Sequence, residues 1–528
     1  MEHLACDVLV VGSGAAGLRA AISARENGAE VCVLSKATPG KGTCTVLSGG
    51  VFAGTPEGVT YEDYLMRTLQ AGRGINNREL VEILVKESPM RLRELAEWGI
   101  KAEFHDGYLY SDGRPPVWGE EIVRCLLNRN KALETKLMGG MVVTELSMEQ
   151  GRGAVLVYRL DSGTWLTIGA KAIILAAGGA GALYLRHDNP KSMLGDGYVL
   201  ALQAGAVLQD MEFVQFYPLG LAEPGLPRFL LPLHLADSGK LMNSSGEEIL
   251  GKYGIQEKLA GDMARDRLSQ AIFTEIHRMG DEVWLDLRGL PEDAWRADPV
   301  SAFTQGMLGD RYGAKDRPLR VAPVAHFVMG GACVDSRGVT SVPGLFAAGE
   351  VSGGLHGANR MGGNALTETV VFGARVGEAA AAWAKETGKS KADIAFQESD
   401  HPHVESDPSK APSMPAQLID RLRKVLWEQG ILRNGEGLTE ALDEVKQIWE
   451  EAFGMPLEGN PRQVLRLLEL RFAVQTASLI LEAALRREES RGAHFREDFP
   501  SQDDKNWLGH LQVSQSPEGD PIWTFRPV

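Results

Sequence analysis

The chain has 528 residues, of which 44% are hydrophobic, 24% charged and 7% aromatic, a composition typical of a globular protein with about three or four domains. Its formal charge of −15 argues against a protein that binds the phosphate backbone of nucleic acids. The five cysteines are scattered and form no CxxC pair, so the sequence predicts no metal site, iron–sulfur cluster or disulfide framework.

The beginning of the chain has neither the basic segment nor the cleavage-site pattern of a secretory signal. The longest stretch without a charged residue, residues 42–56, has 15 residues. A membrane span needs about 20 predominantly apolar residues. These features predict a cytoplasmic protein with no direct membrane span.

The first 35 residues carry the most informative pattern. An apolar run of strand length, residues 6–11, leads into a glycine turn, a segment of helix formers and a second apolar run that ends at Leu34. This is the context in which a dinucleotide-binding fingerprint is found. Gly12 permits the tight turn, Gly14 lets a pyrophosphate approach the backbone, and Gly17 lets the helix pack on the strand. The N-terminus of that helix would then face the phosphates.

The residues after the second strand depart from the general fingerprint. An acidic residue is expected there, and the chain has Ser35 and Lys36 instead. Taken alone, this replacement favours NADP, because a positive charge accommodates the extra phosphate.

Two more glycine-rich units follow downstream. Residues 170–179 repeat the pattern of an apolar run followed by glycines, and Asp196 lies at the predicted start of a helix. Residues 343–350 form the third unit, in which Glu350 directly follows the apolar run and is suited to the ribityl chain of a flavin. An alanine-rich helix is predicted over residues 372–385.

The remaining segments differ in composition from these units. Residues 217–334 lack the pattern of apolar runs followed by glycines and are predicted to form an inserted domain. Residues 386–415 are polar and are predicted to form a linker. Residues 416–490 have helical spacing of their leucines, which predicts a helical bundle.

The motifs resemble those of one family over nearly the whole chain, the flavoprotein subunit of the succinate dehydrogenase, fumarate reductase and L-aspartate oxidase superfamily. The motifs that carry the resemblance are residues 12–17, 43–50, 176–179, 211–215, 283–288, 356–360, 435–438, 487–500 and 506–507. In this family a Ser-Lys pair commonly follows the second strand, so Ser35 and Lys36 do not require NADP.

The resemblance implies an α/β fold with an FAD-binding Rossmann-like domain, an inserted α+β capping domain and a C-terminal helical bundle. The expected boundaries are 1–216 and 335–385 for the FAD-binding domain, 217–334 for the capping domain, 386–415 for a linker, 416–500 for the helical domain and 501–528 for a C-terminal tail.

The resemblance also assigns the residues that contact FAD. They are Gly12, Gly14, Ala15, Gly17, Ser35, Lys36, Thr43, Cys44, Thr45, Gly49, Gly50, Val142, Ala177, Gly178, Asp196, Glu350, Arg360, Ala365 and Leu366. Members found in membrane complexes attach the flavin covalently to a histidine, and Thr43 stands at that position. We therefore expect FAD to be noncovalent.

Three catalytic residues are expected from the family motifs. Arg265 matches the arginine that transfers a proton, although Ala264 replaces the proline before it. His326 and Arg360 match the histidine and the arginine that grip one substrate carboxylate, a role that suits the planar guanidinium fork. Arginine is normally never deprotonated, so the role of Arg265 requires a transient loss that is relayed through neighbours such as Asp266.

The other half of the substrate site departs from the family pattern. Tyr217 replaces a histidine that grips the second carboxylate, and Leu231, Pro232 and Leu235 replace a threonine, a glutamate and an arginine. A second buried carboxylate without partners would cost several kcal/mol. We therefore expect a substrate with one carboxylate and an apolar remainder, which Tyr217, Leu231 and Leu235 would contact.

The favoured interpretation is an FAD-dependent enoate reductase or acid dehydrogenase that acts on the α,β C–C bond of a small carboxylic acid or acyl substrate. Two alternatives stay open: a flavoprotein of the L-aspartate oxidase or fumarate/succinate oxidoreductase type, and a non-catalytic electron-relay subunit. The resemblance implies a separate iron–sulfur subunit or another redox partner. It leaves open the substrate tail, the direction of reaction and the oligomeric state.

Overall fold

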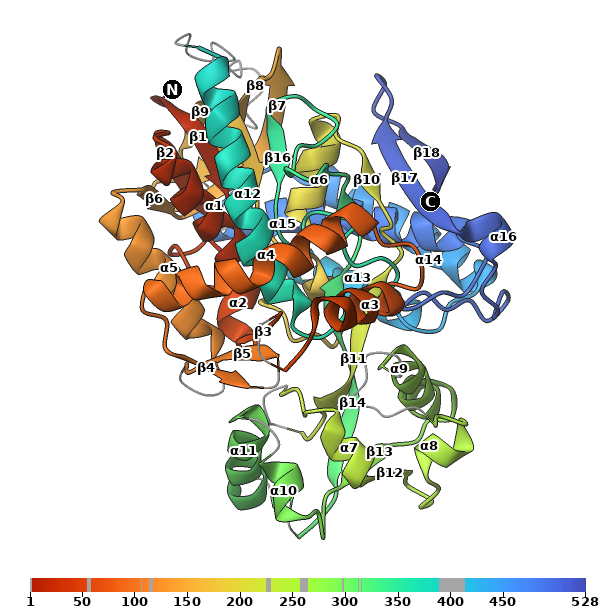
Figure 1. Ribbon diagram of the computed structural model, residues 1–528. Coiled ribbons are helices and arrows are strands. Elements are labelled where there is room, and N and C mark those ends of the chain that lie inside the picture. The colour runs from red at the N-terminus through yellow and green to blue at the C-terminus, as the bar shows by residue number, and fades with distance from the viewer. Residues whose placement is uncertain are drawn as a thin grey trace.

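The computed structural model describes residues 2–54, 58–105, 107–113, 117–224, 229–256, 265–296, 299–311, 313–314, 316–388 and 414–528. Figure 1 shows a large upper body that contains both termini and a smaller lobe below it, which is built from the middle of the chain. Two long strands of the lobe, β11 and β14, run up into the body.

The body is organised around a seven-stranded sheet in the order β6-β2-β1-β9-β8-β7, with β16 pairing the end of β9. Strands β6, β2, β1, β9 and β16 are parallel, and β7 and β8 form an antiparallel extension. The strands are β1 (Glu2–Val11), β2 (Val31–Ser35), β6 (Lys136–Gly139), β7 (Met141–Glu149), β8 (Arg152–Arg159), β9 (Trp165–Leu175) and β16 (Leu345–Ala347). Most of their apolar residues are buried, as in other parallel sheets covered by helices.

Helices α1 (Ala15–Glu26) and α12 (Asn364–Glu386) lie side by side on one face of the sheet (Figure 1). Glycines make this close approach possible. A Cβ on Gly377 would lie 2.1 Å from the carbonyl oxygen of Ala20, and one on Gly373 would lie 2.9 Å from that of Ala16. The first strand, turn, helix and second strand thus occur where the sequence pattern predicts them.

The remaining elements of the body surround this core. They are α2 (Cys44–Leu47), β3 (Val51–Ala53), α3 (Tyr61–Ala71), α4 (Arg78–Glu97), β4 (Ala102–His105), β5 (Tyr108–Ser111), α5 (Gly119–Ala132), α6 (Asp196–Gln203), β10 (Leu208–Gln209) and β15 (Gly331–Ala332). The chain enters α6 through Gly195 in a left-handed conformation, with φ of 88°, and Asp196 lies in the first turn as predicted.

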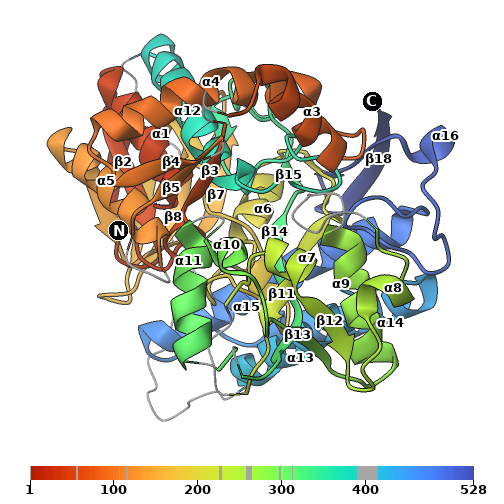
Figure 2. The same ribbon diagram turned by 60° about the horizontal axis from the view of Figure 1, so that its bottom comes forward.

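The lobe has a four-stranded antiparallel sheet of its own, in the order β11-β14-β13-β12. Its strands are β11 (Val214–Leu221), β12 (Lys240–Asn243), β13 (Val283–Asp286) and β14 (Leu319–Val328), and its α-helices are α7 (His234–Ser238), α8 (Ile249–Lys252), α9 (Arg265–Phe273), α10 (Glu292–Trp295) and α11 (Pro299–Gly306). A separate hydrophobic core joins these elements, so the lobe is a distinct packing unit. Figure 2 shows its helices arranged around this sheet.

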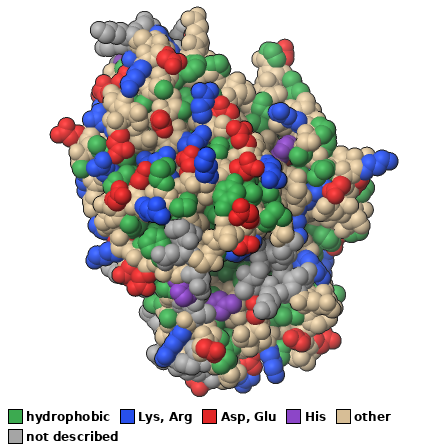
Figure 3. Space-filling model, in the orientation of Figure 1, with side chains coloured by type: hydrophobic (Ala, Val, Ile, Leu, Met, Phe, Trp, Pro, Cys, Tyr) green, Lys and Arg blue, Asp and Glu red, His purple; other side chains and the backbone are tan. Residues whose placement is uncertain are grey.

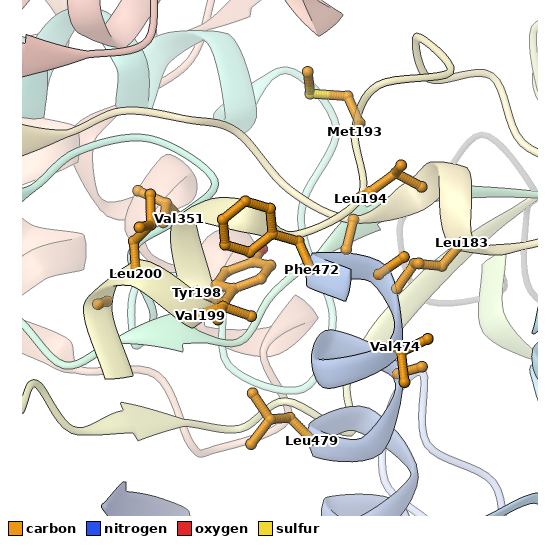
Figure 4. Close-up of a cluster of buried hydrophobic side chains, with 14 of the residues drawn as sticks. Leu183, Met193, Leu194, Tyr198, Val199, Leu200, Val351, Phe472, Val474 and Leu479 are labelled. Atoms are coloured by element: carbon orange, nitrogen blue, oxygen red, sulfur yellow. The ribbon is translucent and has the colours of Figure 1, made fainter. Parts of the chain in front are cut away.

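The C-terminal region contains three long helices, α13 (Met414–Glu428), α14 (Gly435–Gly454) and α15 (Pro461–Arg486), where helical spacing predicts them. Phe472 of α15 lies beside Tyr198 of α6, whereas Val474 lies on the side of Leu183, as Figure 4 shows. All four side chains belong to one hydrophobic core. This contact fixes the helical region to α6 of the body.

Residues 501–528, expected as a tail, contain α16 (Asp504–Trp507) and a hairpin of β17 (Gly509–Gln515) and β18 (Pro521–Pro527). Strand β17 also pairs with β10, so the tail is integrated into the body. The predicted linker lies almost entirely outside the described residues. Among the helices that the structure describes, none combines the length and apolar character needed to cross a bilayer. Side chains of both charges are interspersed over the face seen in Figure 3.

Candidate functional site

A cavity of about 970 Å³ lies between the sheet of the body and the lobe. It touches the carboxyl ends of the central parallel strands at Val11, Ser35, Ala176 and Ala348. The carboxyl edge of a parallel sheet is where open α/β folds bind their ligands.

Most of the residues predicted to hold FAD line this cavity. They are Gly12, Gly14, Ala15, Ser35, Lys36, Thr43, Cys44, Thr45, Gly49, Gly50, Ala177, Gly178, Asp196, Glu350, Arg360, Ala365 and Leu366. Two predicted residues are not on the wall. Gly17 lies behind the turn, and Val142 is buried while its neighbours Met141 and Val143 line the cavity.

The three fingerprint glycines have different surroundings. A Cβ on Gly12, where φ is 118°, would lie 2.1 Å from the carbonyl oxygen of Ala176, and one on Gly17 would lie 2.1 Å from that of Gly12. At Gly14 the nearest atom would be Thr45 Oγ1 at 3.6 Å. Gly12 and Gly17 are therefore required by backbone packing, whereas a side chain on Gly14 would take up space that a ligand can use.

Internal hydrogen bonds hold the loops around this turn. The Ser13 hydroxyl donates to Ser35 Oγ at 2.8 Å and accepts a hydrogen bond from Gly40 N at 2.9 Å. Lys36 Nζ donates to the Ser192 carbonyl at 3.0 Å and lies 3.4 Å from Asp196 Oδ2. Burial would lower the pKa of Lys36, but Asp196 and Glu469 more than offset it, so the pKa is raised and the lysine stays charged.

Thr43 is the N-cap of α2, where its Oγ1 accepts a hydrogen bond from Val46 N at 3.4 Å. The next side chain is a thiol, Cys44, whose pKa is raised well above its usual value by burial. A protonated thiol is a poor nucleophile. Neither side chain thus has the character of a flavin attachment point.

Glu350 follows β16 and lines the cavity as a half-buried residue. Its Oε1 accepts a hydrogen bond from Val328 N at 3.0 Å, and burial raises its pKa to about 8. A carboxyl group with this pKa can donate as well as accept hydrogen bonds near neutral pH, which suits the hydroxyl groups of a ribityl chain.

At the lobe end of the cavity, His326 is held by its surroundings. Its Nδ1 lies 2.6 Å from Asp188 Oδ2, and Asn189 Nδ2 donates both to Asp188 Oδ1 at 2.8 Å and to the His326 carbonyl at 3.1 Å. Because Asp188 engages Nδ1, the ring keeps one orientation and Nε2 is available for a ligand.

Arg360 is buried, lines the same cavity as His326 and is fixed at its guanidinium. Its Nη2 donates to Gln215 Oε1 at 2.8 Å, and its Cζ lies 4.8 Å from the centre of the Phe327 ring. Arg265, the first residue of α9, donates from Nη1 to the Arg360 carbonyl at 3.4 Å and lies 5.6 Å from the Tyr217 ring. The fold thus brings Arg265, His326, Arg360 and Tyr217 together on one wall.

Two residues predicted to contact the substrate are placed elsewhere. Leu231 and Leu235 are fully buried in the core of the lobe and do not line the cavity. Leu231 N donates to the Leu219 carbonyl at 2.9 Å, in an extended pairing where successive side chains point to opposite sides. Its neighbours Leu230 and Pro232 therefore face the cavity in its place.

Apolar side chains that the sequence reasoning missed complete this wall: Trp118, Phe229, Val300, Phe303 and Met307. Trp118 comes from the body and Phe303 from the lobe, and their rings meet edge to face at 5.1 Å. No family motif marks these residues, and they follow from neither periodicity nor spacing. Their only common signal is apolar character in segments on both sides of the cavity.

The site fits a dinucleotide flavin, with a glycine turn at a helix N-terminus and a long cavity that ends at fixed cationic side chains. Residues 7–366 match the FAD binding domain family, and residues 419–528 match the fumarate reductase flavoprotein C-terminal family. FAD is therefore the cofactor, as the sequence predicts.

Full-length relatives have the same domain content. The chain is 35% identical to a fumarate reductase (CoM/CoB) subunit of Methanothermobacter marburgensis, over 94% of this chain and 95% of that protein. It is 31% identical to L-aspartate oxidase of Streptomyces coelicolor, over 98% and 92%. Its structure is similar to that of FrdA from the quinol fumarate reductase of E. coli, with a TM-score of 0.86, 28% identity and coverage of 100% and 97%.

Proposed function

Because this chain belongs to the succinate dehydrogenase and fumarate reductase flavoprotein family, we propose that it acts on the α,β C–C bond of a monocarboxylic acid with an apolar tail. The family establishes an FAD-dependent oxidoreductase acting on CH–CH groups. The one-carboxylate substrate rests on the make-up of the lobe end of the cavity.

The observation that carries this proposal is the division of that end into two halves. Arg265, His326 and Arg360 provide the cationic half. Among the residues that the structure describes, those on the other half are all apolar: Phe229, Leu230, Pro232, Val300, Phe303 and Met307. A single carboxylate would bind the first half, and a ring or branched chain would occupy the second.

Tyr217 does not restore a second carboxylate site. Its hydroxyl donates to the Leu231 carbonyl at 2.8 Å, so its only proton is committed to the backbone. A carboxylate placed there would be desolvated beside apolar side chains, at a cost of several kcal/mol. This argues against succinate, fumarate and aspartate as preferred substrates.

The catalytic roles follow from the cationic half. His326 and Arg360 would clamp the carboxylate and stabilise the negative charge that develops next to it during the reaction. Bound FAD supplies hydride transfer to or from the substrate carbon. Arg265 would transfer the proton at the neighbouring carbon, and its Nη1 contact with the Arg360 carbonyl fixes it beside the clamp.

We also propose that FAD is bound without a covalent link, because Thr43 offers no imidazole and Cys44 a protonated thiol. After acid precipitation, the yellow colour should stay in the supernatant. A yellow pellet would contradict this part of the proposal.

Electrons would come from or go to a separate redox partner. Among the described residues, no group of His, Cys, Asp and Glu side chains is arranged to hold a metal ion. The relatives include flavoprotein subunits of fumarate reductases, which favours a partner with an iron–sulfur cluster.

The test is a comparison of kcat/KM for fumarate, acrylate and cinnamate, measured without oxygen and with a reduced dye as the electron donor. Burying a ring in the apolar half contributes roughly 2–3 kcal/mol, at about 25 cal/mol per Å². Cinnamate should then exceed acrylate by about 30- to 150-fold, and fumarate should be poorest.

Phe303→Ala should reduce the preference for cinnamate, while Phe104→Ala on the exposed strand β4 serves as the control. Fumarate turnover equal to or above that of cinnamate would refute the one-carboxylate substrate. Rapid release of hydrogen peroxide when the substrate-reduced enzyme meets oxygen would instead favour an oxidase related to L-aspartate oxidase.

A further inference from the structure

An ion pair joins the lobe to the body next to Arg265. Arg73 Nη2 lies 3.1 Å from Asp266 Oδ2 and 3.4 Å from Asp266 Oδ1. Arg73 lies in the turn between α3 and α4 of the body, and Asp266 is the second residue of α9 in the lobe. The pair therefore spans the boundary between the two units, one residue from the proposed proton-transfer arginine.

The backbone of Arg73 is held in an unusual conformation. Its φ is 55°, in the left-handed region that residues other than glycine rarely adopt. Arg491 of the C-terminal region donates from Nη1 to the Arg73 carbonyl at 2.8 Å, and Glu489 fixes Arg491 through two hydrogen bonds, of 2.7 and 3.0 Å. Such a conformation persists only where the surroundings impose it. The C-terminal region thus holds the backbone of Arg73, while its side chain pairs with Asp266 of the lobe.

The two side chains of this ion pair differ in their exposure to solvent. The Asp266 side chain is 7% exposed and that of Arg73 is 20% exposed, so Arg73 is the member of the pair that is more open to water. Burial raises the pKa of Asp266, and Arg73 opposes that rise. Of the other charged groups nearby, Arg265 and Arg267 adjoin Asp266 in α9. The side chains that share its small inner cavity from β11 and the turn before α12 include Gln215 and Asn359, which are neutral.

We propose that Arg73 is a positioning residue for proton transfer, which orients the Asp266 carboxylate and keeps it able to exchange a proton with its neighbour Arg265. This inference rests on the proposed role of Arg265. In dehydrogenation, the Arg265 guanidinium first passes one of its protons to the Asp266 carboxylate, and the neutral guanidine then takes the proton from the substrate. Asp266 releases the proton it has received to water on the side of Arg73, which returns both groups to their starting charge. In reduction the same proton moves in the opposite direction, so the balance of protons is kept.

The test compares Arg73→Gln, which removes the charge, with Arg73→Lys, which keeps it. In Arg73→Gln the limb of the kcat–pH profile that reports Asp266 should move to higher pH, in both directions of the reaction. Because the positive charge of Arg73 next to Asp266 is lost, kcat should fall by about tenfold or more at pH values on the steep part of that limb. Arg73→Lys should restore most of the profile, and KM should change little.

Arg78→Gln, which removes an exposed arginine that pairs with Glu82 at 2.8 Å, is the matched control and should leave the profile unchanged. A uniform fall in kcat without a shift of the limb, or equal losses in Arg73→Gln and Arg73→Lys, would overturn the proposal.

A second measurement does not depend on turnover. In the FAD-loaded protein, the infrared band of protonated carboxyl groups should persist to higher pH in Arg73→Gln than in the wild type. The difference should vanish when Asp266→Asn is added. If the band does not change, Arg73 does not control Asp266 and the inference fails, whatever the role of Arg265. If the band shifts while Arg265→Ala keeps wild-type turnover, Arg73 controls Asp266 without a proton route through Arg265, which overturns both the inference and the catalytic role on which it rests.

Discussion

The two walls of the cavity are built from different parts of the chain and by different means. The flavin wall consists largely of backbone, with Gly12, Gly14 and Gly178 at close approaches and a helix N-terminus behind them. The substrate wall consists of side chains, from Tyr217 and Leu230 to Phe303, which project from the lobe.

This difference teaches which features of a flavoprotein can vary. A backbone cradle tolerates little change, because a Cβ at Gly12 or Gly17 would lie 2.1 Å from a carbonyl oxygen. A wall of side chains can change its chemistry residue by residue while the strands below it keep their pairing. The chain therefore keeps the family's cofactor site, while the apolar lobe side supports the proposal of a different substrate.

The largest effect should come from the cationic half of the substrate wall. Arg265→Ala should lower turnover by about 10²- to 10⁴-fold, the range for losing a general acid–base group, and FAD content should stay at the wild-type level. Steady-state turnover and the flavin absorbance of the purified variant measure both. Arg267→Ala, on the exposed side of the same helix, is the control. Turnover of Arg265→Ala within about tenfold of the wild type would assign the proton to another group.

The next effect separates the substrate wall from the core behind it. Leu231→Ala removes a fully buried side chain and should destabilise the protein by about 2–5 kcal/mol. Leu230→Ala alters a partly buried residue on the wall, so it should lower kcat/KM for cinnamate with a much smaller loss of stability. Urea unfolding and kinetics of both variants provide the comparison. The reverse pattern would place Leu231 on the wall.

On the flavin wall, two glycines should respond differently to the same substitution. Gly17→Ala forces a Cβ against the Gly12 carbonyl and should cost about 1–3 kcal/mol of stability. Gly14→Ala has room in the protein and should fold normally, but it should bind FAD about tenfold more weakly, a change of about 1.4 kcal/mol. Thermal unfolding of the apoproteins and FAD titration distinguish the two. Unchanged FAD affinity in Gly14→Ala would mean that no ligand approaches this glycine.

The smallest effect concerns the pH dependence of the flavin wall. Burial raises the pKa of Glu350 to about 8, whereas its ordinary value is near 4.5. Between these pH values the folded apoprotein keeps a proton that the unfolded chain loses, so stability should fall as pH rises. Glu350→Gln removes this dependence and should gain about 1 kcal/mol or less relative to the wild type between pH 7 and pH 8. A constant difference in Tm between the two deflavinated proteins would contradict the raised pKa.

Local patterns in the sequence were sufficient to predict the flavin wall. Gly12, Gly14 and Gly17 lie between an apolar run and a helix, and their spacing determines the geometry of the flavin wall. A segment of a few residues is enough for this, because a tight turn and a close packing contact require glycine locally. The family, the fold class and FAD, all predicted from the motifs, are confirmed.

The residues that form the substrate wall could be identified only from the tertiary structure. Sequence motifs identify Leu231 and Leu235 as replaced positions, but only the pairing of Leu231 with Leu219 shows that alternate residues face the cavity. Residues that meet across the boundary between body and lobe, such as Trp118 with Phe303 and Arg73 with Asp266, have no common signal along the chain.

The amino-acid sequence by itself thus determined the cofactor, the order of elements and the candidate set of Arg265, His326 and Arg360, since each depends on a motif of a few neighbouring residues. Only the tertiary structure decided which side chains face the substrate and which carboxylate stands beside Arg265. Those contacts join segments up to 193 residues apart, as between Arg73 and Asp266, and packing between separate units sets them.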